Sequence, residues 1–245
     1  MMRRFKLAGG NGEMFWLEGD EFRHLTTVLR LGAGARIVGF DGDRSYVGII
    51  AGIEDGRAWC RVESTLAATG EPAAAVYLAL GLLKGDKMEL ALQKGVELGM
   101  AGFIPLAAAR SVARPDERRQ ETRRARREKI AAAAVKQCGR IRAPEIFPTS
   151  EWKDLPDLLP RDTRYFLAWE EEKKRSFRAE LAGVDWARPL AILIGPEGGF
   201  TRAEAMAATV ELKATPVSLG ARILRAETAA LAALTMALGA AGDLG

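Results

Sequence analysis

The 245-residue sequence predicts an α/β protein, in which a small β-rich module precedes a larger and mainly parallel sheet covered by helices. Three observations predict this fold class. Short β-rich runs separated by Gly and Asp turns fill roughly the first 65 residues. From residue 75 onward, apolar runs of strand length alternate with helical patterns, which indicates βα units. One of these runs ends in a glycine-rich loop that leads into a helix start, where α/β proteins often bind ligands.

The N-terminal module is expected to form a small β-barrel. Its four β-rich runs are EMFWLEG, ARIVGFDG, SYVGIIAGIE and RAWCRVEST, and a helical pattern at residues 20–30 interrupts them. Several short strands at this spacing are typical of such a barrel. Residues 67–72, AATGEP, have the composition of a linker. We therefore predict two domains, residues 1–69 and 70–245.

The second domain alternates strand and helix along its length. Strands are predicted at residues 75–83, 102–107, 164–170, 189–195 and 215–220. Helices are predicted at residues 86–99, at residues 116–138 and from about 226 to 240. The spacing Thr201-x-x-Glu204 is a capping box and marks one more helix start. Repeated βα units predict a largely parallel sheet with both faces covered.

Composition excludes several classes of protein. No run of 18 apolar residues occurs, and the basic N-terminus lacks the apolar segment of a signal peptide. Cys60 and Cys138 lie far apart and form no zinc motif, so a reduced cytoplasmic protein without metal is expected. The single histidine, His24, excludes a histidine-rich metal site, and a Ser-His-Asp triad would depend on it.

The glycine-rich segment LIGPEGGF, residues 193–200, is a candidate binding loop. Its glycines allow backbone amides to approach a ligand closely. The spacing matches neither of the glycine motifs that bind nucleotides, no lysine is present to reach phosphates, and Glu197 would repel them. A turn between strand and helix with no function is the alternative interpretation.

A second candidate segment is LGARILRAETAA, residues 219–230. Arg222, Arg225 and Glu227 gather at the start of a helix that is otherwise almost wholly apolar. Arginine at a helix N-terminus opposes the helix dipole, so helix stability does not explain it. The alternative is a weak surface pair between Arg225 and Glu227.

Basic residues favour RNA as the partner, although the net charge is only +4. Arginines also crowd residues 110–127, where interspersed acidic residues leave a solvated helix as the alternative. His24 is more often a packing residue than a functional one. The candidate RNA contacts are Arg3, Arg4, Arg23, His24, Arg30, Lys84, Lys87, Lys94, Arg140 and Arg142.

Five blocks along the chain resemble, in order, the motifs of the ribosomal small-subunit RNA methyltransferase E family. They are HLTTVLRLGAGARIVGFDG, KGDKMELALQKGVELG, KQCGR, LIGPEGGFTRAE and LGARILRAETAALAAL. The resemblance implies a PUA-like N-terminal β-barrel and a C-terminal domain of the SPOUT class with a deep trefoil knot, an exception to the rule that chains do not knot. It also implies a homodimer that uses S-adenosylmethionine to methylate N3 of a uridine in 16S ribosomal RNA, within the small subunit.

The same resemblance implies which residues bind the cofactor. They lie in three loops: Leu167, Ala168 and Glu170; Ile194, Gly195, Pro196, Glu197, Gly198 and Gly199; and Leu219, Gly220, Ile223, Leu224, Arg225, Thr228 and Ala229. A cationic cofactor without a polyphosphate suits a glycine loop that carries a glutamate and no lysine.

Arg225 and Glu227 are the candidate catalytic residues. Arg225 would stabilise the negative charge that develops on the uracil ring, and Glu227 would act as a base or orient that arginine. Two alternatives stay open: an RNA-binding or ribosome-assembly factor without catalysis, and a SPOUT methyltransferase acting on another RNA position. A metabolic enzyme that binds a nucleotide through GPEGG is disfavoured by the missing lysine.

Overall fold

The computed structural model describes residues 2–67, 70–111 and 117–244, which form two compact units. The first unit contains Met1–Glu71 together with Val135–Ala143, and the second contains Pro72–Ala134 and Pro144–Gly245. Residues 135–143, predicted to lie in the second domain, group with the first unit in the structure. Within the described residues, no helix is long and apolar enough to cross a membrane.

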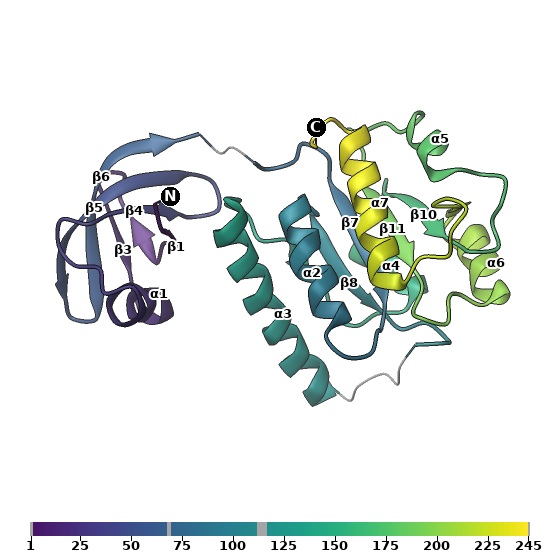
Figure 1. The fold of residues 1–245 in the computed structure, drawn as a ribbon, viewed down its shortest axis with the longest axis horizontal. Coiled ribbons are helices and arrows are strands. Elements are labelled where there is room, and N and C mark those ends of the chain that lie inside the picture. Colours follow the sequence, from purple (N-terminus) through teal and green to yellow (C-terminus); the bar gives the residue numbers. More distant parts are fainter. Residues whose placement is uncertain (1, 68–69, 112–116, 245) are drawn as a thin grey trace. The chain divides into compact units, whose positions relative to one another are not determined.

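The first unit is built on a curled six-stranded sheet with the order β1-β4-β5-β6-β3-β2 (Figure 1). Its strands are β1 (Arg4–Lys6), β2 (Gly9–Gly10), β3 (Met14–Leu17), β4 (Arg36–Phe40), β5 (Ser45–Glu54) and β6 (Arg57–Leu66). Two register shifts between β5 and β6 mark bulges, which bend the long strand pair. The helical segment predicted at residues 20–30 forms α1 (Gly19–Arg23) and the π-helical turn η1 (His24–Val28). Leu25 from this turn is buried with Phe5, Phe15 and Ile37 in the core of the sheet.

A buried ion pair joins Arg140 to Glu71 within this unit. The Glu71 carboxylate accepts hydrogen bonds from Arg140 Nη2 at 3.0 Å, from Ile141 N at 2.7 Å and from Arg142 N at 3.0 Å. Only 5% of Arg140 is exposed, so its guanidinium anchors residues 135–143 rather than facing solvent. The predicted contact of Arg140 with RNA remains a prediction, and the burial of its charge against a carboxylate does not favour it.

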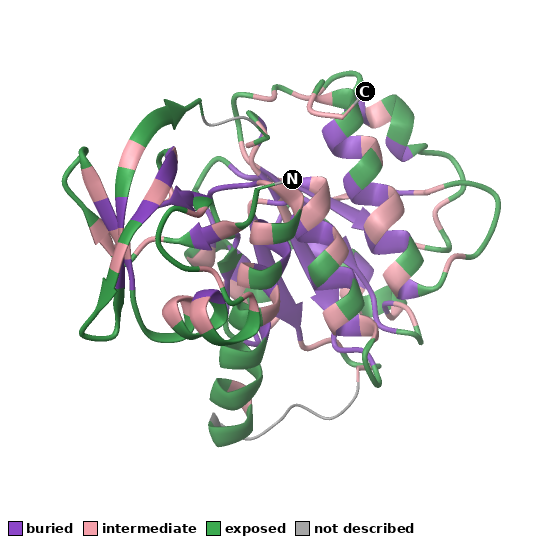
Figure 2. Cartoon of the chain, turned by 60° about the vertical axis from the view of Figure 1, so that its left-hand side comes forward, coloured by how far each residue is buried: buried purple, intermediate pink, exposed green. Residues whose placement is uncertain are grey.

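The second unit contains a six-stranded sheet with the order β12-β10-β11-β7-β8-β9, in which every pair of neighbours is parallel. Its strands are β7 (Val76–Gly81), β8 (Gly102–Leu106), β9 (Glu145–Ile146), β10 (Arg164–Ala168), β11 (Leu190–Ile194) and β12 (Thr215–Val217). All five residues of β11 are buried, as expected for a central parallel strand covered on both faces. Figure 2 shows this burial concentrated in the sheet.

Helices cover both faces of this sheet. The helices of this unit are α2 (Lys87–Leu98), α4 (Leu155–Leu158), α5 (Phe177–Leu181), α6 (Arg202–Glu211) and α7 (Ala226–Ala240), together with α3 (Glu117–Cys138) as far as Ala134. Helix α7 packs on β7, β11 and α2, and its buried face is mostly alanine, which permits close approach. Helix α6 packs with a second core that includes Phe147, Leu155 and Tyr165.

The long elements predicted for this unit are all present. The capping box is confirmed, because Thr201 Oγ1 accepts from Glu204 N at 3.1 Å and Thr201 N donates to Glu204 Oε2 at 2.8 Å. Helix α3 is described from Glu117, so the expected start at Asp116 lies outside the described residues. Strand β9 and the short helices α4 and α5 were not predicted.

Candidate functional site

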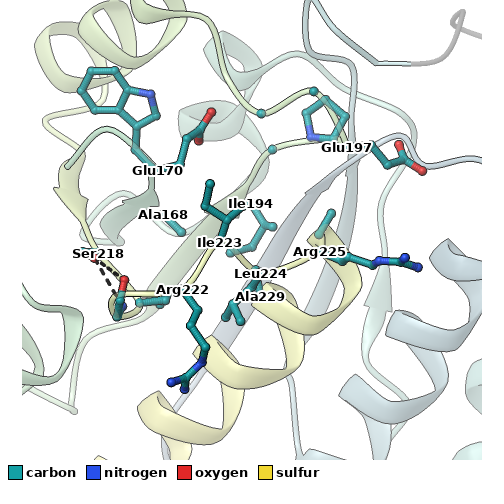
Figure 3. A pocket seen from close by; sticks show the side chains of 18 of the residues that line it. Ala168, Glu170, Ile194, Glu197, Ser218, Arg222, Ile223, Leu224, Arg225 and Ala229 are labelled. Atoms are coloured by element: carbon teal, nitrogen blue, oxygen red, sulfur yellow. Dashed lines mark hydrogen bonds between the residues drawn. The ribbon is translucent and has the colours of Figure 1, made fainter. Parts of the chain in front are cut away.

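A pocket of about 530 Å³ opens at the carboxyl ends of β10, β11 and β12 (Figure 3). Three loops form it, one after each of these strands, and the first turn of α7 closes one side. This edge of a parallel sheet is where open α/β proteins bind ligands. The apolar side chains of Ile194, Ile223, Leu224 and Ala229 lie at its centre.

Most of the residues predicted to bind the cofactor line this pocket. The lining includes Ala168, Glu170, Ile194, Gly195, Pro196, Glu197, Gly198, Gly199, Leu219, Gly220, Ile223, Leu224, Arg225 and Ala229. Leu167 and Thr228 are not among the lining residues: Leu167 is buried in the sheet core and Thr228 is exposed on α7. The structure thus brings together residues from loops that are far apart in the sequence.

Several lining residues were not predicted. They are Lys87, Trp169, Lys173, Ser218, Ala221, Arg222 and Ala226. Lys87 and Arg222 were singled out from the sequence, but not as lining a cofactor pocket. Trp169 lies between Ala168 and Glu170, which were both predicted to bind the cofactor. This position in the sequence could have indicated that Trp169 also lines the pocket. The indole Nε1 of Trp169 is buried with no hydrogen-bond acceptor among the described residues, so a ligand in the pocket could accept a hydrogen bond from it.

Glycine is required where the loops after β10 and β11 touch. Gly199 has a φ of 67°, and a Cβ there would lie 2.2 Å from Glu170 Oε1. At the end of β7, a Cβ on Gly81 would lie 2.4 Å from the backbone nitrogen of Pro196. Both positions are thus closed to any larger side chain, and the glycine-rich loop is seated directly on its neighbours.

Replacing Gly81 by alanine should displace this loop. The new methyl group meets backbone atoms of Gly195 and Pro196, which cannot rotate away, so we expect a loss of about 1–3 kcal/mol of stability. Because a small misplacement of a binding loop is costly, cofactor affinity should fall by about 10-fold or more. Thermal unfolding and calorimetric titration with S-adenosylmethionine would measure the two effects.

Gly183→Ala is the matched control for this substitution. The nearest atom to a Cβ at Gly183 is 3.9 Å away, and its backbone conformation suits any residue. This control should bind and unfold like the parent chain. Unchanged affinity in Gly81→Ala would show that the loop is not seated as described.

The side chain of Glu197 points away from the pocket centre (Figure 3). Its Oε1 accepts hydrogen bonds from Lys84 N at 3.2 Å and from Lys87 Nζ at 3.3 Å. Burial alone would raise the pKa of this carboxyl, but the bonds from Lys84, from its own backbone N–H and from Lys87 hold it below the ordinary value. Arg110 Nη1 donates to the carbonyl of the next residue, Gly198, at 2.8 Å. The contacts of Glu197 with Lys84 and Lys87, and of Gly198 with Arg110, therefore hold the loop from two sides.

Arg225 and Glu227 lie at the start of α7 but do not contact each other. Arg225 is the N-cap of the helix, is exposed and lines the pocket mouth. Glu227 lies in the first turn and is not among the lining residues; its Oε2 is buried and has no partner within the described part of the chain. In the described part of the chain, no ion pair or hydrogen bond joins the side chains of Arg225 and Glu227. The surface pair that the sequence left open is thus not the arrangement found.

Most of the candidate RNA contacts already have protein partners. Arg23 pairs with Asp20 at 2.6 Å, Lys94 with Glu97 at 2.8 Å, and Arg142 with Asp43 at 3.2 Å, all partly or fully in solvent. Arg4 Nη2 donates to Ser45 Oγ, and its guanidinium lies over the Phe40 ring. The His24 ring is 6.1 Å from that of Phe5. Arg3, Arg30 and Lys84 are exposed.

Comparison with known proteins gives matches in both units. The RNA methyltransferase domain family matches residues 70–238, and the RNA methyltransferase PUA domain family matches residues 17–63. Ribosomal RNA small subunit methyltransferase E of Bacillus subtilis (strain 168) is 34% identical, over 90% of this chain and 88% of that protein. The protein of the same name from Mycobacterium tuberculosis (strain CDC 1551 / Oshkosh) is 30% identical, over 95% of this chain and 87% of its own length.

Solved structures agree with these matches. The crystal structure of ribosomal RNA small subunit methyltransferase E from Neisseria gonorrhoeae, bound to S-adenosyl methionine, superposes with a TM-score of 0.83. It is 28% identical, and the match covers 96% of this chain and 95% of that one. A Legionella pneumophila structure in complex with the bound cofactor SAM gives a TM-score of 0.85 at 27% identity, over 98% of both chains.

Proposed function

Because this chain belongs to the ribosomal RNA small subunit methyltransferase E family, we propose that it transfers a methyl group from S-adenosylmethionine to N3 of a uridine in 16S ribosomal RNA. The observation that carries the proposal is the pocket itself. It combines an apolar centre, a glycine-rich loop and an exposed arginine at its mouth. Lys87 and Lys173 also line it, and Lys87 is paired with Glu197 of the glycine-rich loop.

The residues of the pocket fit this cofactor. Ile194, Leu224 and Ala229 supply apolar surface for the adenine ring, and loop backbone groups can read its edge. The unpartnered Nε1 of Trp169 and the carboxylate of Glu170 offer a donor and an acceptor for polar groups. When bound, S-adenosylmethionine supplies an electrophilic methyl group on a cationic sulfur.

Arg225 and Glu227 have the chemistry that the RNA substrate requires. The N3 proton of uridine must leave before the nitrogen can take a methyl group, and the ring oxygens then carry negative charge. Arg225 lies at the pocket mouth, where its guanidinium can stabilise that charge. We propose Glu227 as the group that accepts the proton, although its side chain does not line the pocket. It directly follows the lining residues Arg225 and Ala226, and its Oε2 is buried and unpartnered among the described residues.

We also propose that the three pocket loops belong to a deep trefoil knot and that the chain acts as a homodimer. The sheet order supports the knot, since the last strand, β12, pairs with β10 on the side away from β11. Ile223 at the pocket is 87% exposed, and a second copy would cover such an apolar side chain. Light scattering tests the dimer. We also propose that the protein acts in the cytoplasm, where its ribosomal substrate lies.

The deciding experiment is transfer of labelled methyl groups from S-adenosylmethionine to small ribosomal subunits that lack the modification. Digestion to nucleosides should yield labelled 3-methyluridine. Another labelled nucleoside would show a different target position within the same class of enzyme. Failure to bind S-adenosylmethionine in a calorimetric titration would instead favour the non-catalytic RNA-binding factor.

RNA binding should weaken steeply with salt if basic side chains such as Arg3, Arg30 and Lys84 meet phosphates. The logarithm of the affinity should fall linearly with the logarithm of the salt concentration, with a slope of about −0.7 for each single-stranded phosphate contacted. Replacing Arg3 and Arg30 by glutamine should make this slope shallower. Fluorescence titration with a 16S transcript measures it, and a flat salt response would contradict the assignment.

A further inference from the structure

Arg127 on α3 is a buried cation with no hydrogen bond or ion pair to any of the described residues. Only 6% of the residue is exposed, and among the described residues nothing accepts a hydrogen bond from its guanidinium. Its neighbours on the helix differ, because Arg126 pairs with Glu89 at 2.6 Å and Arg124 with Glu128 at 3.1 Å. A buried guanidinium with five donors and no acceptor is uncommon and points to a missing ligand.

The electrostatic setting of Arg127 supports this interpretation. Burial and the nearby charge of Arg123 lower the pKa of Arg127 to about 10, although Glu89 acts in the opposite direction. Keeping the Arg127 guanidinium charged in the folded protein therefore costs free energy. An anion beside the guanidinium would remove that cost.

A second cavity, of about 200 Å³, lies directly at Arg127. Gln120, Glu121, Arg124 and Arg127 line it from one side, and Pro148 and Thr149, which follow β9, line it from the other. Positions 120, 124 and 127 share one face of α3, because they are four and three residues apart. A water molecule takes about 30 Å³, so there is room for a phosphate group with some of its hydration.

We propose that this cavity binds a phosphate group of the RNA backbone, with the Arg127 guanidinium as its main ligand. The planar fork of arginine matches phosphate geometry, and the exposed Arg118, Arg119 and Arg123 on the same helix favour approach of a polyanion. Glu121 at the cavity opposes an anion, so its removal should strengthen binding. The proposal rests on the RNA substrate class argued above.

The position of the cavity fits one continuous RNA substrate. Strand β9 runs parallel to the others, so the cavity that follows it lies at the same carboxyl edge as the first pocket. The N-terminal half of α3 reaches this edge (Figure 1). Strands β11 and β9 are separated by β7 and β8, which is about 14 Å at the usual spacing of neighbouring strands. A strand of RNA whose uridine enters the first pocket could continue to the second.

The test compares Arg127→Met with Arg178→Met, which removes an exposed arginine from α5. The full-length Arg127→Met chain should bind a 16S transcript about 10-fold more weakly, with a salt slope shallower by about 0.7. Its KM for small subunits should rise while kcat and S-adenosylmethionine affinity stay unchanged. Arg178→Met should match the parent chain in all five measurements, and Glu121→Gln should bind the transcript more tightly.

A second measurement uses inorganic phosphate as the probe, added against chloride at equal ionic strength. Phosphate should raise the melting temperature of the parent chain and of Arg178→Met but not that of Arg127→Met. Equal stabilisation of all three chains would overturn the anion site. Loss of the phosphate effect with parental RNA affinity would show a site for a free anion and overturn the RNA proposal. Both readouts stay measurable if no methyl transfer is found, so failure of the proposed function is seen separately.

Discussion

Replacing Arg225 by alanine should lower kcat for methyl transfer by about 10²–10³-fold, the usual effect of removing one group that stabilises charge in a transition state. The side chain is exposed at the pocket mouth, and no other described residue holds it by an ion pair. Its loss should therefore disturb the fold little. Affinity for S-adenosylmethionine should change by less than about threefold, because surface substitutions of this kind cost only about 0.5 kcal/mol.

Single-turnover kinetics with saturating cofactor would measure the effect of Arg225→Ala. Arg222→Ala is the matched control, because Arg222 is also exposed and lines the same pocket from the same loop. Figure 3 shows the two side chains pointing in different directions. A parental rate in Arg225→Ala would remove this arginine from the mechanism. An equal loss in both variants would mean that general positive charge, rather than the position of Arg225, supports transfer.

Replacing Glu71 by alanine should destabilise the first unit by about 3 kcal/mol. The substitution leaves Arg140 buried without its carboxylate and removes the acceptor of the Ile141 and Arg142 backbone N–H groups. Hydrogen exchange of β5 and β6 would measure the change within this unit alone. Asp43→Ala is the control, since Asp43 pairs with Arg142 in solvent and should contribute less than about 1 kcal/mol. Equal effects from both variants would contradict the structural role of the buried pair.

The Glu71–Arg140 pair makes the stability of the folded chain depend on pH in the acidic range. Burial alone would raise the pKa of Glu71, but hydrogen bonds from Arg142, Arg140 and Ile141 hold it below the ordinary value. A carboxyl whose pKa is lower in the folded chain contributes fully above its unfolded pKa of about 4.3, and the contribution is lost as the pH falls through the folded value. Glu71→Gln should therefore flatten the acid limb of stability against pH.

The parallel sheet could be predicted because its strands carry a strong local signal. Strand β11 is a run of five apolar residues, all buried, and α7 follows a clear helix start. Strand β9 has two residues and α4 has four, which is too short for any periodicity to emerge. Their positions depend on packing against residues remote in the chain.

The pocket could be predicted as a set of loops, but the direction of individual side chains could not. A glutamate in a glycine-rich loop could face the ligand or brace the loop. The choice at Glu197 is made by Lys84 and Lys87, more than 100 residues earlier. Arg140 is a similar case, because its partner Glu71 lies 69 residues away. Arg127 is one of many arginines in its helix, and only the packing around α3 distinguishes it as buried.

The first unit is discontinuous in sequence, because residues 135–143 belong to it together with residues 1–71. The chain passes from this unit to the second after Glu71, returns at Val135 and leaves again after Ala143. A gene fragment for residues 1–71 would therefore encode a unit without the buried Val135, Arg140 and Ile141. Recombination cannot transplant the first unit as one continuous block. Cleavage of the chain after Glu71 should nick the protein without releasing residues 1–71 as a free fragment. The two halves of such an enzyme are expected to have been inherited together.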